Sequence, residues 1–86
     1  MKYTVQLERA AQKQLAKIPH PFLEAIDEKI LALENDPRPP GCKKLKGKDG
    51  WRIRIGDYRV IYTINDGMLL VLVIEIGNRK NIYRKN

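Results

Sequence analysis

Three arginines in the second half of the sequence are spaced to form an anion site. Residues 51–55, WRIRI, alternate strictly, which predicts a strand with Arg52 and Arg54 on one face. Gly56-Asp57 is typical of a tight two-residue hairpin turn. In that register Arg54 lies opposite Arg59 of the next strand. Guanidinium groups bind phosphate through paired hydrogen bonds, so the cluster predicts a phosphate site.

The apolar residues support the same register, because it pairs Ile53 with Val60 on the opposite face. Like charges directly opposite each other destabilise a sheet, and the three arginines have no evident acidic partner in this pattern. An anion supplied from outside would explain them. The alternative is an ordinary solvated sheet face, with Glu75 or Asp57 as neighbours.

Composition and charge narrow the class of protein. The chain has 86 residues, which predicts one small domain, and its single cysteine, Cys42, excludes an internal disulfide. No signal-type leader is seen, and the longest apolar run, 68–74, is too short to span a bilayer, so we expect a cytoplasmic protein with no membrane partner. The net charge of +7 arises entirely from residues 43–86. This asymmetry indicates a nucleic-acid or acidic protein partner.

Periodicity predicts an α+β fold, with an antiparallel-dominated sheet and an N-terminal helical hairpin packed on one face. The second hairpin turns at residues 65–67, and the last strand is apolar on both faces, which predicts a central strand covered on both sides, at least in part. The face on which Glu75 lies depends on the length of that turn. In chain order, the pattern (β-α-α-β-β-β) is a strand at 2–7, helices at 8–18 and 22–35, and strands at 51–55, 58–64 and 68–76.

A basic linker precedes the arginine strands. Residues 36–50 are rich in Pro, Gly and Lys, and Leu45 is expected to anchor them to the core. We interpret the linker as a mobile basic arm for an RNA backbone, the alternative being a solvated loop with scattered lysines. Its candidate RNA-binding residues are Lys43, Lys44, Lys46 and Lys48.

Further candidates follow the last strand. Arg79 is close enough in sequence to reach the arginine cluster, and Tyr83 supplies a ring for stacking or a hydroxyl, unless it simply packs at the sheet edge. Arg84 is another candidate RNA-binding residue. His20 is the only histidine and is expected to be a surface residue at a helix start. With one Cys and one His, the chain lacks the ligands of a zinc site, and no metal or other cofactor is expected.

Together these motifs resemble the RelE toxins of the RelE/ParE superfamily. The resemblance rests on KKLKG-x-x-G-W-R-I-R-I-G-D-Y-R-V-I-Y-T-I and on the strand end VLVIEIGNR, with a tyrosine four residues later. It covers nearly the whole chain. It implies the toxin of a type II toxin–antitoxin system, with an acidic RelB-like antitoxin as partner.

The resemblance also implies an activity, which is metal-independent cleavage of mRNA in the ribosomal A site. A ribose 2′-hydroxyl attacks the adjacent phosphodiester and leaves a cyclic phosphate and a 5′-hydroxyl. The positions that match the family's catalytic residues are Arg52, Arg54, Arg59, Arg79 and Tyr83.

Two departures from the family pattern bear on the chemistry. Many relatives have lysine in the pair occupied here by Arg52 and Arg54, and arginine does not lose its proton to act as a base. Asn78 stands where many relatives have histidine. The sequence leaves two alternatives open: a ParE-like inhibitor of DNA gyrase, and an RNA-binding module without catalysis.

Overall fold

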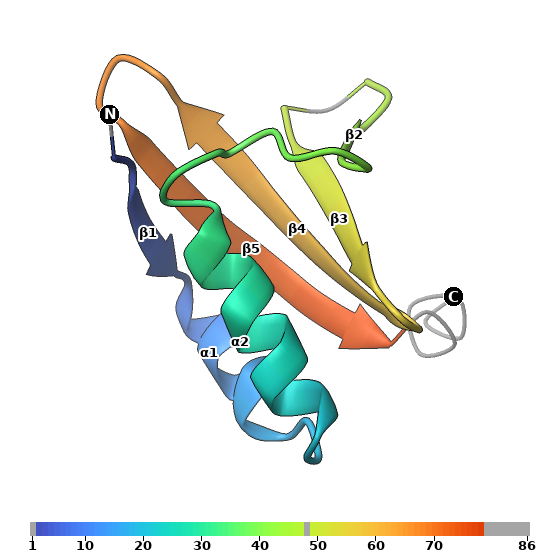
Figure 1. The fold of residues 1–86 in the computed structure, drawn as a ribbon. Helices are drawn as coiled ribbons and strands as arrows, with labels where there is room; N and C mark the ends of the chain where they lie inside the picture. Colours follow the sequence, from blue (N-terminus) through green and yellow to red (C-terminus); the bar gives the residue numbers. More distant parts are fainter. Residues whose placement is uncertain (1, 48, 79–86) are drawn as a thin grey trace.

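The computed structural model describes residues 2–47 and 49–78, which form one five-stranded sheet and two helices (Figure 1). The strand order is β1-β5-β4-β3-β2. β1 is parallel to β5, and every other neighbouring pair is antiparallel. The elements are β1 (Thr4–Leu7), α1 (Arg9–Ala16), α2 (Phe22–Ala32), β2 (Lys43–Lys44), β3 (Trp51–Ile55), β4 (Tyr58–Asn65) and β5 (Leu70–Asn78).

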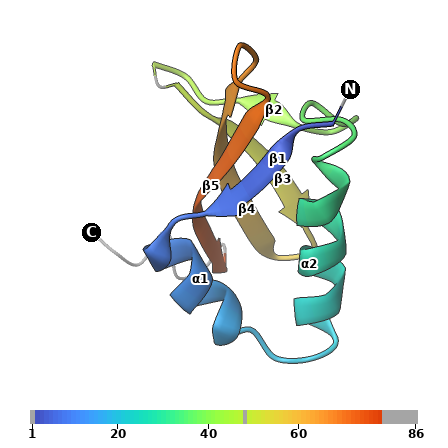
Figure 2. The same ribbon diagram turned by 90° about the vertical axis from the view of Figure 1, so that its left-hand side faces the viewer.

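Both helices pack on one face of the sheet, as predicted (Figure 2). The apolar stripes of the two helices and the inward residues of β3, β4 and β5 form a single core. Its members are Ala11, Ile18, Ile26, Ile30, Leu33, Ile53, Val60, Tyr62, Val71, Val73 and Ile76. Since alternate strand residues point to opposite faces, the residues between these core positions lie on the other face, which we call the open face. Neither described helix is long and apolar enough to cross a membrane.

The predicted register of the first hairpin is confirmed. Ile55 pairs with Tyr58, and Arg54 pairs with Arg59. Gly56 has φ +59 at the first turn position, where the II′ hairpin turn requires a positive φ. The turn chemistry and the apolar pattern therefore specify the same pairing.

The structure departs from the sequence prediction at two places. Part of the predicted linker forms β2, which extends the sheet beyond β3. The second turn spans residues 66–69 rather than 65–67, so β5 begins at Leu70. The prediction of a central last strand is confirmed: β5 lies between β1 and β4, both helices cover one face of it, and Leu70 and Leu72 on its open face are half-buried.

Tyr62 connects the core to the linker. Its side chain is fully buried, and its hydroxyl donates a hydrogen bond of 2.7 Å to the carbonyl oxygen of Pro37. Burial raises the pKa of the Tyr62 phenol, which therefore stays protonated and able to donate. This bond fixes the start of the linker against β4.

We predict that Tyr62→Phe lowers the free energy of unfolding by about 1–3 kcal/mol, because it leaves the Pro37 carbonyl buried without a partner. Urea denaturation of both proteins measures the change. The control is Tyr58→Phe, since the Tyr58 hydroxyl makes no hydrogen bond with a residue in the described ranges. Equal losses in the two variants would contradict the role of this bond.

Candidate functional site

The open face carries a cluster of four cations, Lys43, Arg52, Arg54 and Arg59, which we call the cationic patch. The strand pairing brings them together: Lys43 of β2 lies opposite Arg52 of β3, and Arg54 of β3 lies opposite Arg59 of β4. Paired residues point to the same face with Cβ atoms about 5 Å apart. The grouping of the three arginines that the sequence predicts is therefore confirmed, and their function stays a prediction.

The cations of β2 and β3 lack acidic partners in the described part of the chain. Within residues 2–47 and 49–78, neither Arg52 nor Arg54 forms an ion pair or a side-chain hydrogen bond, and the same holds for Lys43. Arg52 and Arg59 are half-buried, while Arg54 is exposed. A sheet built only for stability would place acids opposite these arginines. The patch is therefore suited to an anion that arrives from outside.

A carboxylate, Glu75, lies beside the patch because of a β-bulge. The four-residue turn alone would pair Glu75 with Val60 on the core face, since it pairs Asn65 with Leu70. The register shifts by one residue between Ile61 and Tyr62, so that Glu75 pairs with Ile61 on the open face. The sequence suggested a shorter turn without a bulge. In the structure, the four-residue turn and the bulge together place Glu75 on the open face.

The basic linker divides its lysines between two faces. Lys43 joins the patch, but Lys44 pairs with Trp51, and its Nζ lies 5.4 Å from the centroid of the Trp51 ring. Lys46 is exposed in the following loop. The prediction of a mobile basic arm is therefore wrong for Lys43 and Lys44, which are held by strand pairing.

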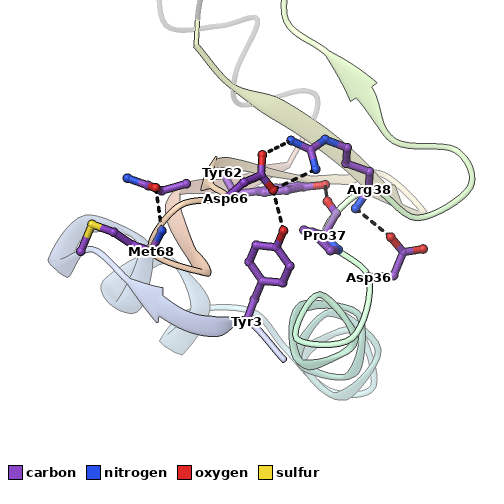
Figure 3. A network of polar contacts seen from close by, with 8 residues as sticks. Tyr3, Asp36, Pro37, Arg38, Tyr62, Asp66 and Met68 are labelled. Carbon is purple, nitrogen blue, oxygen red and sulfur yellow. Dashed lines mark hydrogen bonds and ion pairs between the residues drawn. The ribbon is translucent and has the colours of Figure 1, made fainter. Parts of the chain in front are cut away.

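A polar network fixes the linker at the end of the sheet away from Arg54 and Arg59 (Figure 3). The Arg38 guanidinium donates hydrogen bonds of 2.9 and 3.3 Å to the two carboxylate oxygens of Asp66, and Tyr3 Oη donates one of 2.5 Å to the same group. Hydrogen bonds from Arg38 and Tyr3 hold the pKa of Asp66 below its usual value. The guanidinium also lies 5.1 Å from the centroid of the Trp51 ring.

This network joins the N-terminal strand, the linker and the β4–β5 turn. The sequence did not predict this network, because Asp66 indicates only a turn as part of the Asp-Gly pair. No local pattern links it to Arg38, 28 positions away, or to Tyr3, 63 positions away. Its consequence for the site is indirect. By holding Arg38 against Trp51, it orients the linker that leads into β2.

A hollow of about 240 Å³ lies next to the patch, between α2, the linker and the edge of β3. Arg54 is on its rim, and Lys29 of α2 adds a further cation. The remaining lining residues are Ala32, Pro39, Pro40, Gly41 and Ile53. The hollow gives an anionic ligand bound at Arg54 room to extend past the sheet edge.

Comparisons with known proteins identify the family. Residues 5–83 match the family described as "ParE toxin of type II toxin-antitoxin system, parDE". The chain is 34% identical over 86 residues to "Toxin RelE" of Mycobacterium tuberculosis, covering 98% of this chain and 89% of that protein. It is 31% identical over 88 residues to "Putative toxin RelE1" of Methanocaldococcus jannaschii, covering 98% of each.

The chain belongs to the RelE/ParE toxin superfamily. Solved structures agree with this assignment. The RelE–RelB complex of Pyrococcus horikoshii gives a TM-score of 0.82 at 30% identity, with 92% of this chain and 97% of that chain covered. The RelBE2 toxin–antitoxin complex of Mycobacterium tuberculosis also gives 0.82, at 28% identity, with 92% and 93% covered.

Several predicted site residues of this RelE/ParE toxin lie outside the described residues, namely Lys48, Arg79, Tyr83 and Arg84. Their assignments remain predictions. His20 is exposed and contacts Glu24 through its Nδ1, one helical turn away, which agrees with the prediction of a surface residue at a helix start. Cys42 is a free thiol.

We predict that Arg54→Gln raises the free energy of unfolding by about 0.2–1 kcal/mol, because it removes a like-charge pair with Arg59. Added phosphate should stabilise the unmodified toxin more than the variant, because the variant has one guanidinium group fewer to pair with that anion. Urea denaturation with and without phosphate measures both effects. Lys46→Gln, in the exposed loop, is the control for loss of one positive charge. A variant less stable than this control would contradict the prediction.

Proposed function

We propose that this toxin is a ribosome-dependent mRNA endonuclease that inhibits translation. The observation that carries the proposal is the cationic patch on the open face, where Arg52 and Arg54 have no acidic partner among the described residues. Guanidinium groups bind phosphate through paired hydrogen bonds, and mRNA presents one phosphate per nucleotide. The names of the relatives, RelE toxins, support the same choice.

The chemistry proposed is attack by a ribose 2′-hydroxyl on the adjacent phosphorus. The reaction adds negative charge to the non-bridging phosphate oxygens in the transition state, and fixed guanidinium groups nearby stabilise that charge. Arg52, Arg54 and Arg59 take this role, with Arg79 and Tyr83 as further proposed members of the site. Arginine keeps its proton at any physiological pH, so these groups act by charge and position and not as bases.

The shape of the described part of the site supports dependence on the ribosome. The patch lies on a sheet face with both helices on the other side (Figure 2), so it offers little enclosure for a free RNA strand. Holding the nucleophile in line with the leaving group supplies a large part of such rate enhancements. A message that is already held in the ribosomal A site has its nucleophile and leaving group positioned before the toxin binds. The toxin would therefore act in the cytoplasm, on ribosomes.

The partner proposed is an acidic antitoxin of the RelB type. Solved structures similar to this chain are RelE–RelB complexes from Pyrococcus horikoshii and Escherichia coli. The excess positive charge of residues 43–86 favours an acidic, extended partner. Such a partner would keep the toxin from its target.

A ParE-like inhibitor of DNA gyrase is the second candidate, because the matching family carries the ParE description. A protein that inhibits by binding has no need to gather arginines on one face of its sheet. An RNA-binding module without catalysis would keep RNA affinity but would not break the chain. The three candidates differ in what the purified toxin does to ribosomes, to gyrase and to RNA.

We predict that the toxin cuts a defined message on translating ribosomes and leaves the same message uncut in solution. Arg59→Ala should lower the cutting rate about 10²–10³-fold, as expected for loss of one transition-state donor. Primer extension maps and quantifies the cuts. Lys13→Ala is the matched control, since Lys13 is an exposed cation on α1, on the far side of the sheet.

Three results would contradict the proposal. Equal cutting of free RNA would exclude ribosome dependence. Full activity of Arg59→Ala would exclude the patch as the site. No cutting in either setting, with inhibition of gyrase supercoiling, would favour the ParE-like alternative.

A further inference from the structure

We propose that Glu75 is the general base of the reaction and accepts the proton of the attacking 2′-hydroxyl. This inference rests on the proposed nuclease function and supplies the group that the arginines cannot provide. Among the described residues of the five strands, Glu75 is the only carboxylate, and it lies on the same face as the cationic patch. Figure 1 shows its strand, β5, beside β4, which carries Arg59.

The strand register places Glu75 at a working distance from the patch. Two rows of residues cross the open face: Lys43, Arg52, Ile61 and Glu75 in one, and Arg54, Arg59 and Gly77 in the other. Glu75 is the diagonal neighbour of Arg59, at about 7–8 Å, which is within reach of two long side chains. It lies two strands from Arg52, or about 10 Å along the row.

The space between these charges suits one nucleotide. Ile61 forms an apolar floor between Arg52 and Glu75, and Gly77 opposite Arg59 adds no side chain to the second row. A phosphate held by Arg59 and the arginines of β3 would leave its ribose over Ile61. The 2′-hydroxyl would then face the carboxylate.

The surroundings of Glu75 also fit a general base. Its side chain is half-buried and forms no ion pair or hydrogen bond with any residue in the described ranges. It is therefore available to a substrate hydroxyl and is not held in a salt bridge of the fold. The charged groups nearest to it in the strand register are the patch cations on β2, β3 and β4. On its other side β1 runs beside β5, and the backbone N–H of Glu8 donates a hydrogen bond of 2.9 Å to the carbonyl oxygen of Val73.

The β-bulge has a structural role, because it keeps this carboxylate out of the core. That role explains why residue 75 faces away from the core. It does not explain why this residue is a carboxylate, since any polar residue on this face would satisfy the fold. A carboxylate beside an RNA-binding patch repels the substrate, so it weakens binding unless it contributes to the reaction. Catalysis is the contribution that the geometry points to.

The proposed step balances as follows. The 2′-hydroxyl proton moves to a Glu75 carboxylate oxygen while the O2′–P bond forms. The P–O5′ bond breaks, its electron pair leaves with the 5′ oxygen, and that oxygen takes a proton from water. The hydroxide that remains takes the proton from Glu75, which restores the carboxylate. The products are a 2′,3′-cyclic phosphate and a 5′-hydroxyl, and no oxidant, reductant or metal enters the balance.

The test is single-turnover cleavage of a ribosome-bound message by Glu75→Gln, which keeps the size of the side chain but cannot accept the proton. Loss of a general base should lower the rate about 10²–10⁴-fold. Affinity for a 2′-O-methyl message on the ribosome, which cannot be cut, should stay the same or rise. Asp57→Asn, in the exposed β3–β4 turn near the patch, controls for loss of one negative charge and should cut normally.

A second variant separates chemistry from folding. Glu75→Ala should regain activity when acetate or formate is added, because a free carboxylate can take the place of the missing base, and chloride at equal ionic strength should have no effect. Glu75→Gln cutting at the unmodified rate would overturn the proposal, as would a defect confined to message affinity. If the unmodified toxin itself cuts no message, the proposed nuclease function fails first, and the role of Glu75 fails with it.

Discussion

The register of the β3–β4–β5 meander is the constraint on which the rest of this structure depends. A period of two places Ile53, Val60 and Ile76 against the helices, and the same pairing forces Arg54 and Arg59 together on the open face. A slip of one residue would bury the arginines and expose the core. The hydrophobic effect that folds the domain therefore also assembles the cationic patch, with no additional interaction needed to gather it.

Assembly of the patch carries a cost that a domain of 86 residues must offset. Arg54 opposite Arg59 is repulsive, and the open face contributes less burial than the helix-covered face. The compensating contacts lie at the other end of the sheet. There the buried Tyr62 hydroxyl holds Pro37, and Arg38 pairs with Asp66 and packs against Trp51. The contacts that stabilise the fold are thus concentrated away from the cationic patch.

The sequence predicted the arginine grouping because a two-residue turn leaves only one register between β3 and β4. It also predicted both helices, because each has a regular apolar stripe: Ala11 and Leu15 in α1, and Ile26, Ile30 and Leu33 along α2. It did not predict the face of Glu75, because a β-bulge has no local signal of its own, nor the pairing of β2 with β3. The Arg38–Asp66 pair joins residues 28 positions apart, and side-chain contacts across such separations do not follow from periodicity.

The most direct test of the central claim is the structure of the toxin on a ribosome with a 2′-O-methyl message in the A site, determined by electron cryo-microscopy. We predict a message phosphate over the open face, within hydrogen-bond reach of guanidinium groups of the cationic patch. The modified 2′ oxygen should be directed toward Glu75. The proposed function is contradicted if the message lies against the helices, if the open face binds only ribosomal protein, or if the toxin does not bind the ribosome.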